Sequence, residues 1–144
     1  MRTLISSLIL ISAFAISCQQ SEVTPTEDFS ISNQRWVLVR MTGSFQNSET
    51  TGSDMEWQET YDLTQVGSFV KTRITTESTL QASGSYRIRE LTDGLYVEFT
   101  YPKESTLIGN CSSDLIELLR FQDDRLFSTW QACDGPGLEY LQSN

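Results

Sequence analysis

The stretch "ASGSYRIRELTDGLYVEFTY", residues 82–101, decides the fold class. In its first half, small or apolar residues at the even positions from Ala82 to Ile88 alternate with serine and arginine. A Thr-Asp-Gly turn follows, and the second half again places its apolar residues on one face: Leu95, Val97, Phe99 and Tyr101. Period-2 alternation around a short glycine turn is typical of two strands that share one buried face. The stretch therefore predicts a β-hairpin.

The same alternation recurs on both sides of this hairpin. We expect eight short strands, at residues 35–42, 57–64, 68–76, 82–90, 95–101, 115–122, 125–133 and 138–142. The segment 115–122 is rich in Leu and Glu, which favour helices, but the Asp123-Asp124 turn directly after it favours a strand. Eight strands that close on themselves leave no exposed edge and enclose room for one small ligand. The sequence thus predicts an all-β protein, an eight-stranded up-and-down antiparallel barrel, with an open β-sandwich as the alternative.

The first residues have the pattern of an export signal. Arg2 is followed by an uncharged, mostly apolar run to Ser17, which is shorter than the ~20 apolar residues of a membrane-spanning helix. The segment after it, up to about Ser32, is polar, acidic and interrupted by Pro25. We therefore expect a signal peptide at residues 1–17, a flexible tether at 18–32 and one β-barrel domain at 33–144.

The end of the apolar run resembles the bacterial lipobox. Its residues are Ala15-Ile16-Ser17-Cys18, small residues ahead of a cysteine. The resemblance implies that Cys18 becomes the first residue of the mature chain and carries acyl chains such as palmitate, which anchor the protein to a membrane. Gln19, where sorting to the inner membrane uses Asp, implies the outer membrane of the cell envelope. The periplasmic and the outward faces of that membrane both stay open.

The strand pattern itself resembles the lipocalin-like, or calycin, proteins. The resemblance rests on the eight-strand meander and on the "QRW" that opens the first strand at Gln34. It is strongest for the small lipocalin-like lipoproteins of Gram-negative bacteria. It implies that Trp36 lies at the closed end of the barrel against a late arginine, Arg120 or Arg125. It also implies that the long first connection, residues 43–56, covers the open end.

Charge and composition exclude several functions. The whole chain has 10 cations, 19 acidic residues and no histidine. Removal of residues 1–17 takes away one cation, Arg2, and leaves nine cations against 19 acids, a net charge of −10. Nucleic-acid binding depends on the neutralisation of phosphates by basic residues, so it is not expected. The absence of histidine excludes a Ser-His-Asp or Cys-His site and a histidine zinc site. We expect no metal and no cofactor.

With Cys18 acylated, Cys111 and Cys133 are left as a pair. If Asp123-Asp124 form the turn of a hairpin, Gln122 lies opposite Arg125, and Cys133 falls opposite Asp114, three residues from Cys111. Exported domains are oxidised, so a disulfide is expected. A free reactive thiol and a two-cysteine metal site are the alternatives, but neither has the neighbouring side chains that it needs.

The inner face predicts a ligand pocket. Its candidate residues are Arg40, Trp57, Glu59, Tyr61, Tyr86, Phe99, Tyr101 and Trp130. Arg40 and Glu59 would orient the ligand, although a flipped or bulged strand would instead place the charges at the rim. The predicted function is that of a lipid-anchored envelope protein that binds a small apolar or amphipathic ligand in its barrel.

The alternatives are a protein-interaction or inhibitor module and a structural lipoprotein with a filled barrel. An enzyme is not expected. Volume separates these hypotheses, because large side chains that point inward would fill so short a barrel, whereas an open cavity of ~300 Å³ or more would support a ligand.

Overall fold

A computed structural model describes residues 31, 33–43, 45 and 47–143. The chain forms nine strands and two short 3-10 helices in these residues. The elements are β1 (Arg35–Thr42), β2 (Thr50–Thr51), η1 (Gly52–Asp54), β3 (Gln58–Leu63), β4 (Ser68–Ile74), β5 (Thr79–Leu91), β6 (Gly94–Thr100), β7 (Ile116–Gln122), β8 (Arg125–Ser128), η2 (Trp130–Cys133) and β9 (Gly137–Ser143).

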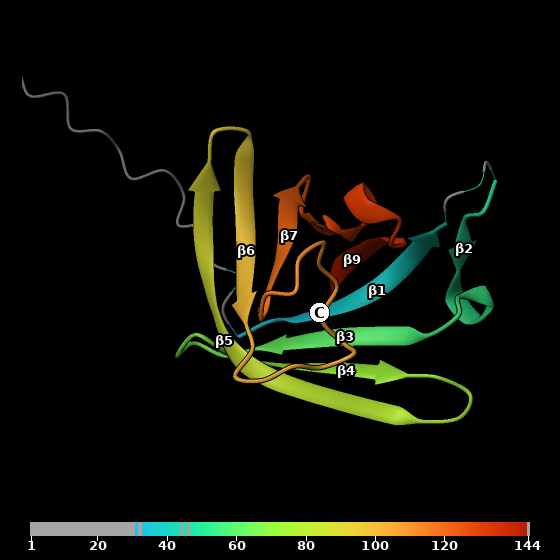
Figure 1. The fold of residues 1–144 in the computed structure, drawn as a ribbon, viewed down its shortest axis with the longest axis horizontal. Coiled ribbons are helices and arrows are strands. Elements are labelled where there is room, and N and C mark those ends of the chain that lie inside the picture. Colours follow the sequence, from blue (N-terminus) through green and yellow to red (C-terminus); the bar gives the residue numbers. More distant parts are fainter. Residues whose placement is uncertain (1–30, 32, 44, 46, 144) are drawn as a thin grey trace, which may run out of the picture.

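Eight of the strands form a closed antiparallel barrel (Figure 1). β1 pairs with β3, and each strand from β3 to β8 pairs with the next. β9 returns to pair with β1 from Arg35–Ser143 to Thr42–Gly137. The two-residue strand β2 lies outside this ring, on the end of β1. The prediction of an up-and-down barrel is therefore confirmed, and the open sandwich is wrong.

The hairpin of β5 and β6 follows the alternation of the sequence. Residues 92–93 form its turn, Phe99 lies opposite Tyr86, and Val97 and Phe99 are fully buried inside the barrel. On the outer face, Glu98 accepts hydrogen bonds from Arg87 and Arg89. The polar and the apolar row thus take the two faces that the pattern predicted.

Strand β1 contains a β-bulge that the sequence did not reveal. Leu38 pairs with Tyr140, but the next pair joins Arg40 to Glu139, so Val39 is the extra residue. Trp36 and Leu38 point inward on one side of the bulge and Met41 on the other, and all three are buried. Because a bulge reverses the faces of the residues that follow it, Arg40 points outward.

Strand β8 is shorter than predicted. It ends at Ser128, and residues 130–133, expected as strand, form η2 instead. The Ser128 hydroxyl donates to the carbonyl of Pro136 and accepts from the amide of Leu138, which holds the chain in a compact turn. Beyond the end of β8, side chains rather than a strand donate hydrogen bonds to carbonyl groups in β7 and just before it. Thr129 donates to the Leu118 carbonyl, and Asn110 donates to those of Asp114 and Ile116.

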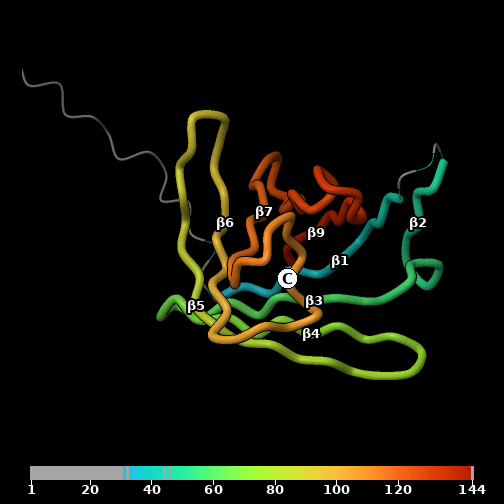
Figure 2. Tube along the Cα trace, viewed as in Figure 1, coloured from blue at the N-terminus to red at the C-terminus, as the bar shows by residue number. Residues whose placement is uncertain are grey.

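The two ends of the barrel differ. Among the described residues, the loop-bearing end is made by 43, 45, 47–57, 75–78, 101–115 and 129–136, and the turn end by 64–67, 92–93 and 123–124. Loop 101–115, orange in Figure 2, folds over the barrel interior, where Leu107 is fully buried. At the turn end, Ile31 is buried in the core. Trp36 packs edge-on against Phe121, while Arg120 and Arg125 lie on the outer face.

Candidate functional site

The barrel interior holds a cluster of buried charges. The ammonium group of Lys71 on β4 lies 3.2 Å from Glu59 Oε1 on β3 and 3.0 Å from Glu117 Oε1 on β7. Its third contact is the carbonyl of Leu107, at 2.6 Å. All three charged side chains are fully buried. Loop 101–115 therefore supplies a backbone acceptor to a charge at the centre of the barrel.

Tyrosines and one arginine complete the cluster. Tyr140 donates to Glu59 and Tyr101 to Glu117, at 2.6 and 2.5 Å. Burial, and then the neighbouring carboxylates, raise the pKa of both tyrosines far above the usual range, so both hydroxyls stay protonated and donate. Arg73 Nε donates to Glu59 Oε2 at 2.5 Å. Two carboxylates thus face two cations, and the cluster is neutral.

The carboxylate groups of this cluster are satisfied by hydrogen bonds. All four carboxylate oxygens of Glu59 and Glu117 accept hydrogen bonds, from Lys71, Arg73, the two tyrosines and the Gly109 amide. Around it, Tyr61, Phe69 and Phe99 stack at centroid distances of 4.6 to 6.3 Å. In the described residues, no group of His, Cys, Asp and Glu has the arrangement of a metal site.

The structure brings some of the predicted pocket residues together. Glu59, Tyr61, Phe99 and Tyr101 meet in the interior and are buried in contact with one another or with Lys71 and Glu117. Trp57 lies at the edge of this group, beneath the loop-bearing end. The inward orientation predicted for Glu59 is confirmed.

Three predicted residues lie elsewhere. Arg40 was expected on the inner face, but the bulge turns it outward, where it pairs with Glu49 and Glu139. Tyr86 is half-buried and donates to the carbonyl of Thr64 at the turn end. Trp130 begins η2 and packs on the core from the loop-bearing end.

Sequence reasoning missed the cations of the cluster. Lys71 and Arg73 share a face with Phe69 in the "SFVKTRI" of β4, and Phe69 is fully buried. That shared face was the available signal, because it places Arg73 opposite the inward Glu59 of β3 and Lys71 opposite the inward Tyr61. The contribution of Leu107 had no comparable signal, since the path of loop 101–115 depends on tertiary contacts.

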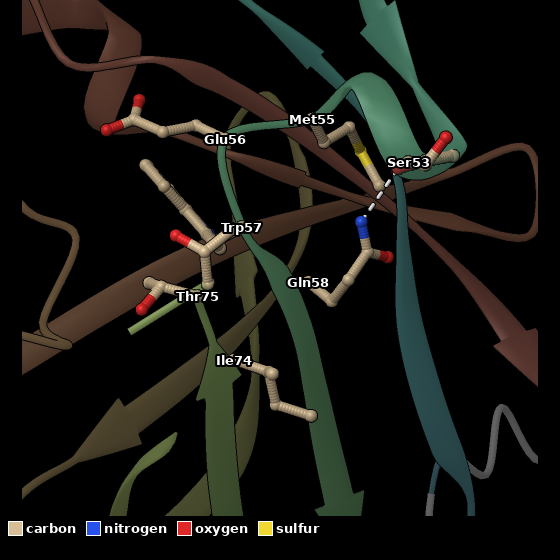
Figure 3. A pocket seen from close by; sticks show the side chains of 9 residues that line it. Ser53, Met55, Glu56, Trp57, Gln58, Ile74 and Thr75 are labelled. Atoms are coloured by element: carbon tan, nitrogen blue, oxygen red, sulfur yellow. Dashed lines mark hydrogen bonds between the residues drawn. The ribbon is translucent and has the colours of Figure 1, made fainter. Parts of the chain in front are cut away.

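A groove lies at the loop-bearing end, outside the charge cluster (Figure 3). It has a volume of about 550 Å³ and is lined by Gly52, Ser53, Met55, Glu56, Trp57, Gln58, Ile74, Thr75 and Thr76. We call it the rim groove. Gln58 crosses from β3 to donate to the Gly52 carbonyl at 2.7 Å, as the dashed line in Figure 3 shows. This bond ties η1 to the barrel, so the groove has an ordered wall.

Trp57 connects the rim groove to the buried cluster. The guanidinium of Arg73 lies 4.2 Å from the centre of the Trp57 ring, a cation–π contact, while its Nε binds Glu59. The indole Nε1 of Trp57 is buried and has no hydrogen-bond partner among the described residues. Trp57 is thus fixed in place, yet it keeps one unused donor.

Cys111 and Cys133 form the expected disulfide, with their Cα atoms 5.5 Å apart. The free thiol and the two-cysteine metal site are therefore wrong. Cys18, the predicted lipidation site, lies outside the described residues.

No helix in the described part of the chain has the length and apolar character needed to cross a membrane. Comparisons of the chain with protein-family models, with curated proteins and with solved structures give no match.

Proposed function

We propose that this protein is a lipid-anchored binding module of the cell envelope, of the lipocalin-like lipoprotein type, without enzymatic activity. Acyl chains on Cys18 would attach it to the outer membrane, and its ligand would be a small apolar or amphipathic molecule. The closed barrel and the disulfide support this proposal, because both suit an exported domain. The apolar leader and the lipobox-like "AISC" support the anchor.

The proposed binding site is the rim groove rather than the barrel interior. The single observation that carries this choice is the contrast between the two places. Large side chains and a satisfied ion cluster occupy the interior, whereas the rim groove offers about 550 Å³, within the ~300–1,000 Å³ typical of small-molecule sites. The ligand that the sequence predicted inside the barrel is therefore proposed at its mouth.

The position of the anchor agrees with this site. Ile31, the first described residue, lies in the core at the turn end, because β1 begins there. The rim groove is at the opposite end of the barrel. An anchor joined to the domain ahead of Ile31 would therefore attach at the end opposite the rim groove.

Native mass spectrometry of the protein purified from its own envelope tests this proposal. The wild type should carry a small molecule that is lost in Ile74→Trp, because the larger ring fills the rim groove. Val70→Trp is the matched control, since Val70 is another exposed position of β4 that does not line the groove. Retention by Ile74→Trp, or a wild type without any small molecule, would contradict the proposal.

A second candidate function is that of a protein-interaction or inhibitor module. The loop-bearing end favours it through its exposed acidic residues, which are Glu49, Asp54, Glu56, Glu77, Glu104, Asp114 and Asp134. Such a surface would attract a basic partner. Crosslinking in the intact envelope would separate the two functions, since a partner protein crosslinked through Glu56 supports the second.

A further inference from the structure

We infer that the ligand of the rim groove is an amphipathic cation, whose positive charge binds at Glu56 and whose apolar part covers Met55, Trp57 and Ile74. This inference rests on the proposed function and adds the chemical class of the ligand. It follows from the charges on the groove wall and from the apolar side chains between them.

The lining of the rim groove combines an apolar floor with one carboxylate. Met55 and Trp57 are buried and Ile74 is about half exposed, at 48%. Glu56 lies between the first two in sequence, is exposed and forms no ion pair with any described residue. None of the described lining residues is a cation. A ligand that covers this wall therefore meets a negative charge that the protein itself does not neutralise.

The surroundings strengthen the negative field. Asp54 and Glu77 flank the lining in sequence, and both are exposed without an ion pair to a described residue. Arg73 is in contact with Trp57, but its charge is already paired with Glu59. An anionic ligand would be repelled here, whereas a cation would be attracted.

A second hollow extends the site beyond Glu56. It has a volume of about 270 Å³ and is lined by Met41, Thr42, Gly43, Ser48, Thr50, Asp54, Glu56 and Pro136. Glu56 lines both hollows, so a cation bound there has apolar surface on two sides, with Asp54 as a second carboxylate.

Three probes of equal chain length test the inference: octyltrimethylammonium, octanol and octanoate. Each is titrated below its micelle concentration and at low salt into the full chain. The indole N–H resonances report the site, because the chain has three tryptophans and a Trp57→Phe variant identifies the signal of Trp57. We expect the ammonium to move this signal at the lowest concentration and octanoate at the highest.

Two variants test whether the carboxylate of Glu56 binds the ammonium group. Glu56→Gln should weaken binding of the ammonium by about 2- to 5-fold, typical of an exposed ion pair, and leave the binding of octanol unchanged. Glu90→Gln is the matched control, because Glu90 is an exposed glutamate near the turn end. It should leave the binding of the ammonium and the binding of octanol unchanged.

The outcomes separate this inference from the proposed function. Equal binding of octanol and the ammonium would overturn the cationic class but keep an amphipathic ligand in the rim groove. An equal loss in Glu56→Gln and Glu90→Gln would show only a general effect of net charge, and would overturn the role of Glu56. If no probe moves the signal of Trp57, the inference and the proposed site both fail.

Discussion

The stability of the barrel interior depends on Lys71. An ammonium group transferred out of water costs several kcal/mol unless ion pairs and hydrogen bonds replace its hydration. Here Glu59, Glu117 and the carbonyl of Leu107 replace it, and the ring of Tyr61 lies 4.9 Å away. The charge is thus compensated by three parts of the chain that are far apart in sequence.

Lys71→Met should lower the free energy of unfolding by about 3–5 kcal/mol, because the buried carboxylate of Glu117 then loses its paired cation, while Glu59 keeps Arg73. Urea denaturation followed by circular dichroism measures this loss. Lys103→Met is the control, since Lys103 is exposed and makes no ion pair with a described residue, and it should change stability by less than ~0.5 kcal/mol. Equal stabilities of the two variants would show that the cluster contributes nothing.

At the same scale, the sequence predicted the orientation of some side chains correctly and of others wrongly. Glu59 and Tyr61 alternate with polar residues in an uninterrupted strand, so period 2 placed them correctly. Arg40 was misplaced because one extra residue, Val39, reverses the faces of β1. No composition rule marks that bulge, since Val39 is itself a good strand residue. Lys71 was overlooked because a cation in a strand is ordinarily solvated.

At the scale of elements, the loop-bearing end is fastened by the disulfide. Cys111 belongs to loop 101–115, and Cys133 ends η2. Gly135 lies so close to the Trp130 ring that an added Cβ would overlap the ring atoms. Loop and helix therefore form one cover, and Leu107 and Gly109 of that cover reach the ion cluster below.

Replacement of both cysteines by serine should destabilise the fold by about 3 kcal/mol, because the bridge closes a loop with a sequence separation of 22. Thermal unfolding of the double variant measures the loss. Wild type unfolded in a reducing agent should show the same loss, while the double variant should not respond to the reductant. A wild type that is equally stable with and without reductant would contradict this expectation.

The strands and their turns were easier to predict than the cover formed by loop 101–115 and η2. Strands can be predicted from the alternation of polar and apolar residues. The predicted Asp123-Asp124 turn is confirmed, with both residues at positive φ, 52° and 58°. The prediction that Cys133 lies near Cys111 is confirmed, but the hairpin register on which it rested extends only to the pair of Leu119 and Ser128, and η2 carries the chain from there to Cys133. The helical turn of η2 could not be predicted, because "STWQAC" alternates as a strand would, and a disulfide and two serine hydrogen bonds outweigh that pattern.

At the scale of the whole molecule, the barrel is closed by the pairing of β1 with β9. On the outer face of this seam, Glu139 of β9 binds Arg40 of β1 and Arg125 of β8. Burial alone would raise the pKa of Glu139, but the hydrogen bonds from Arg125 and Arg40 lower it below its ordinary value. The carboxylate thus links three strands across the closure.

Glu139→Gln should lower stability at neutral pH by about 1–3 kcal/mol, the usual range for hydrogen bonds to charged groups. A folded-state pKa below the unfolded value gives stability that is present at neutral pH and is lost as the pH falls through the folded value. The difference between wild type and variant should therefore shrink below about pH 4. Melting temperatures measured across this range test it, with Glu104→Gln as an exposed control. A difference that is constant with pH would contradict the linkage.

The closure also governs the order in which the molecule can fold. Arg35, in the first strand of the barrel, pairs with Ser143, in its last, so the ring cannot form until β9 has been synthesised. Pairings across such sequence distances are slow, because the entropy of loop closure is lost before any contact compensates for it. A nascent chain that emerges from its N-terminus therefore keeps the ring open until β9 has been made. The export that we propose would make use of this delay, since an unclosed chain can still be threaded across a membrane and then fold on the far side.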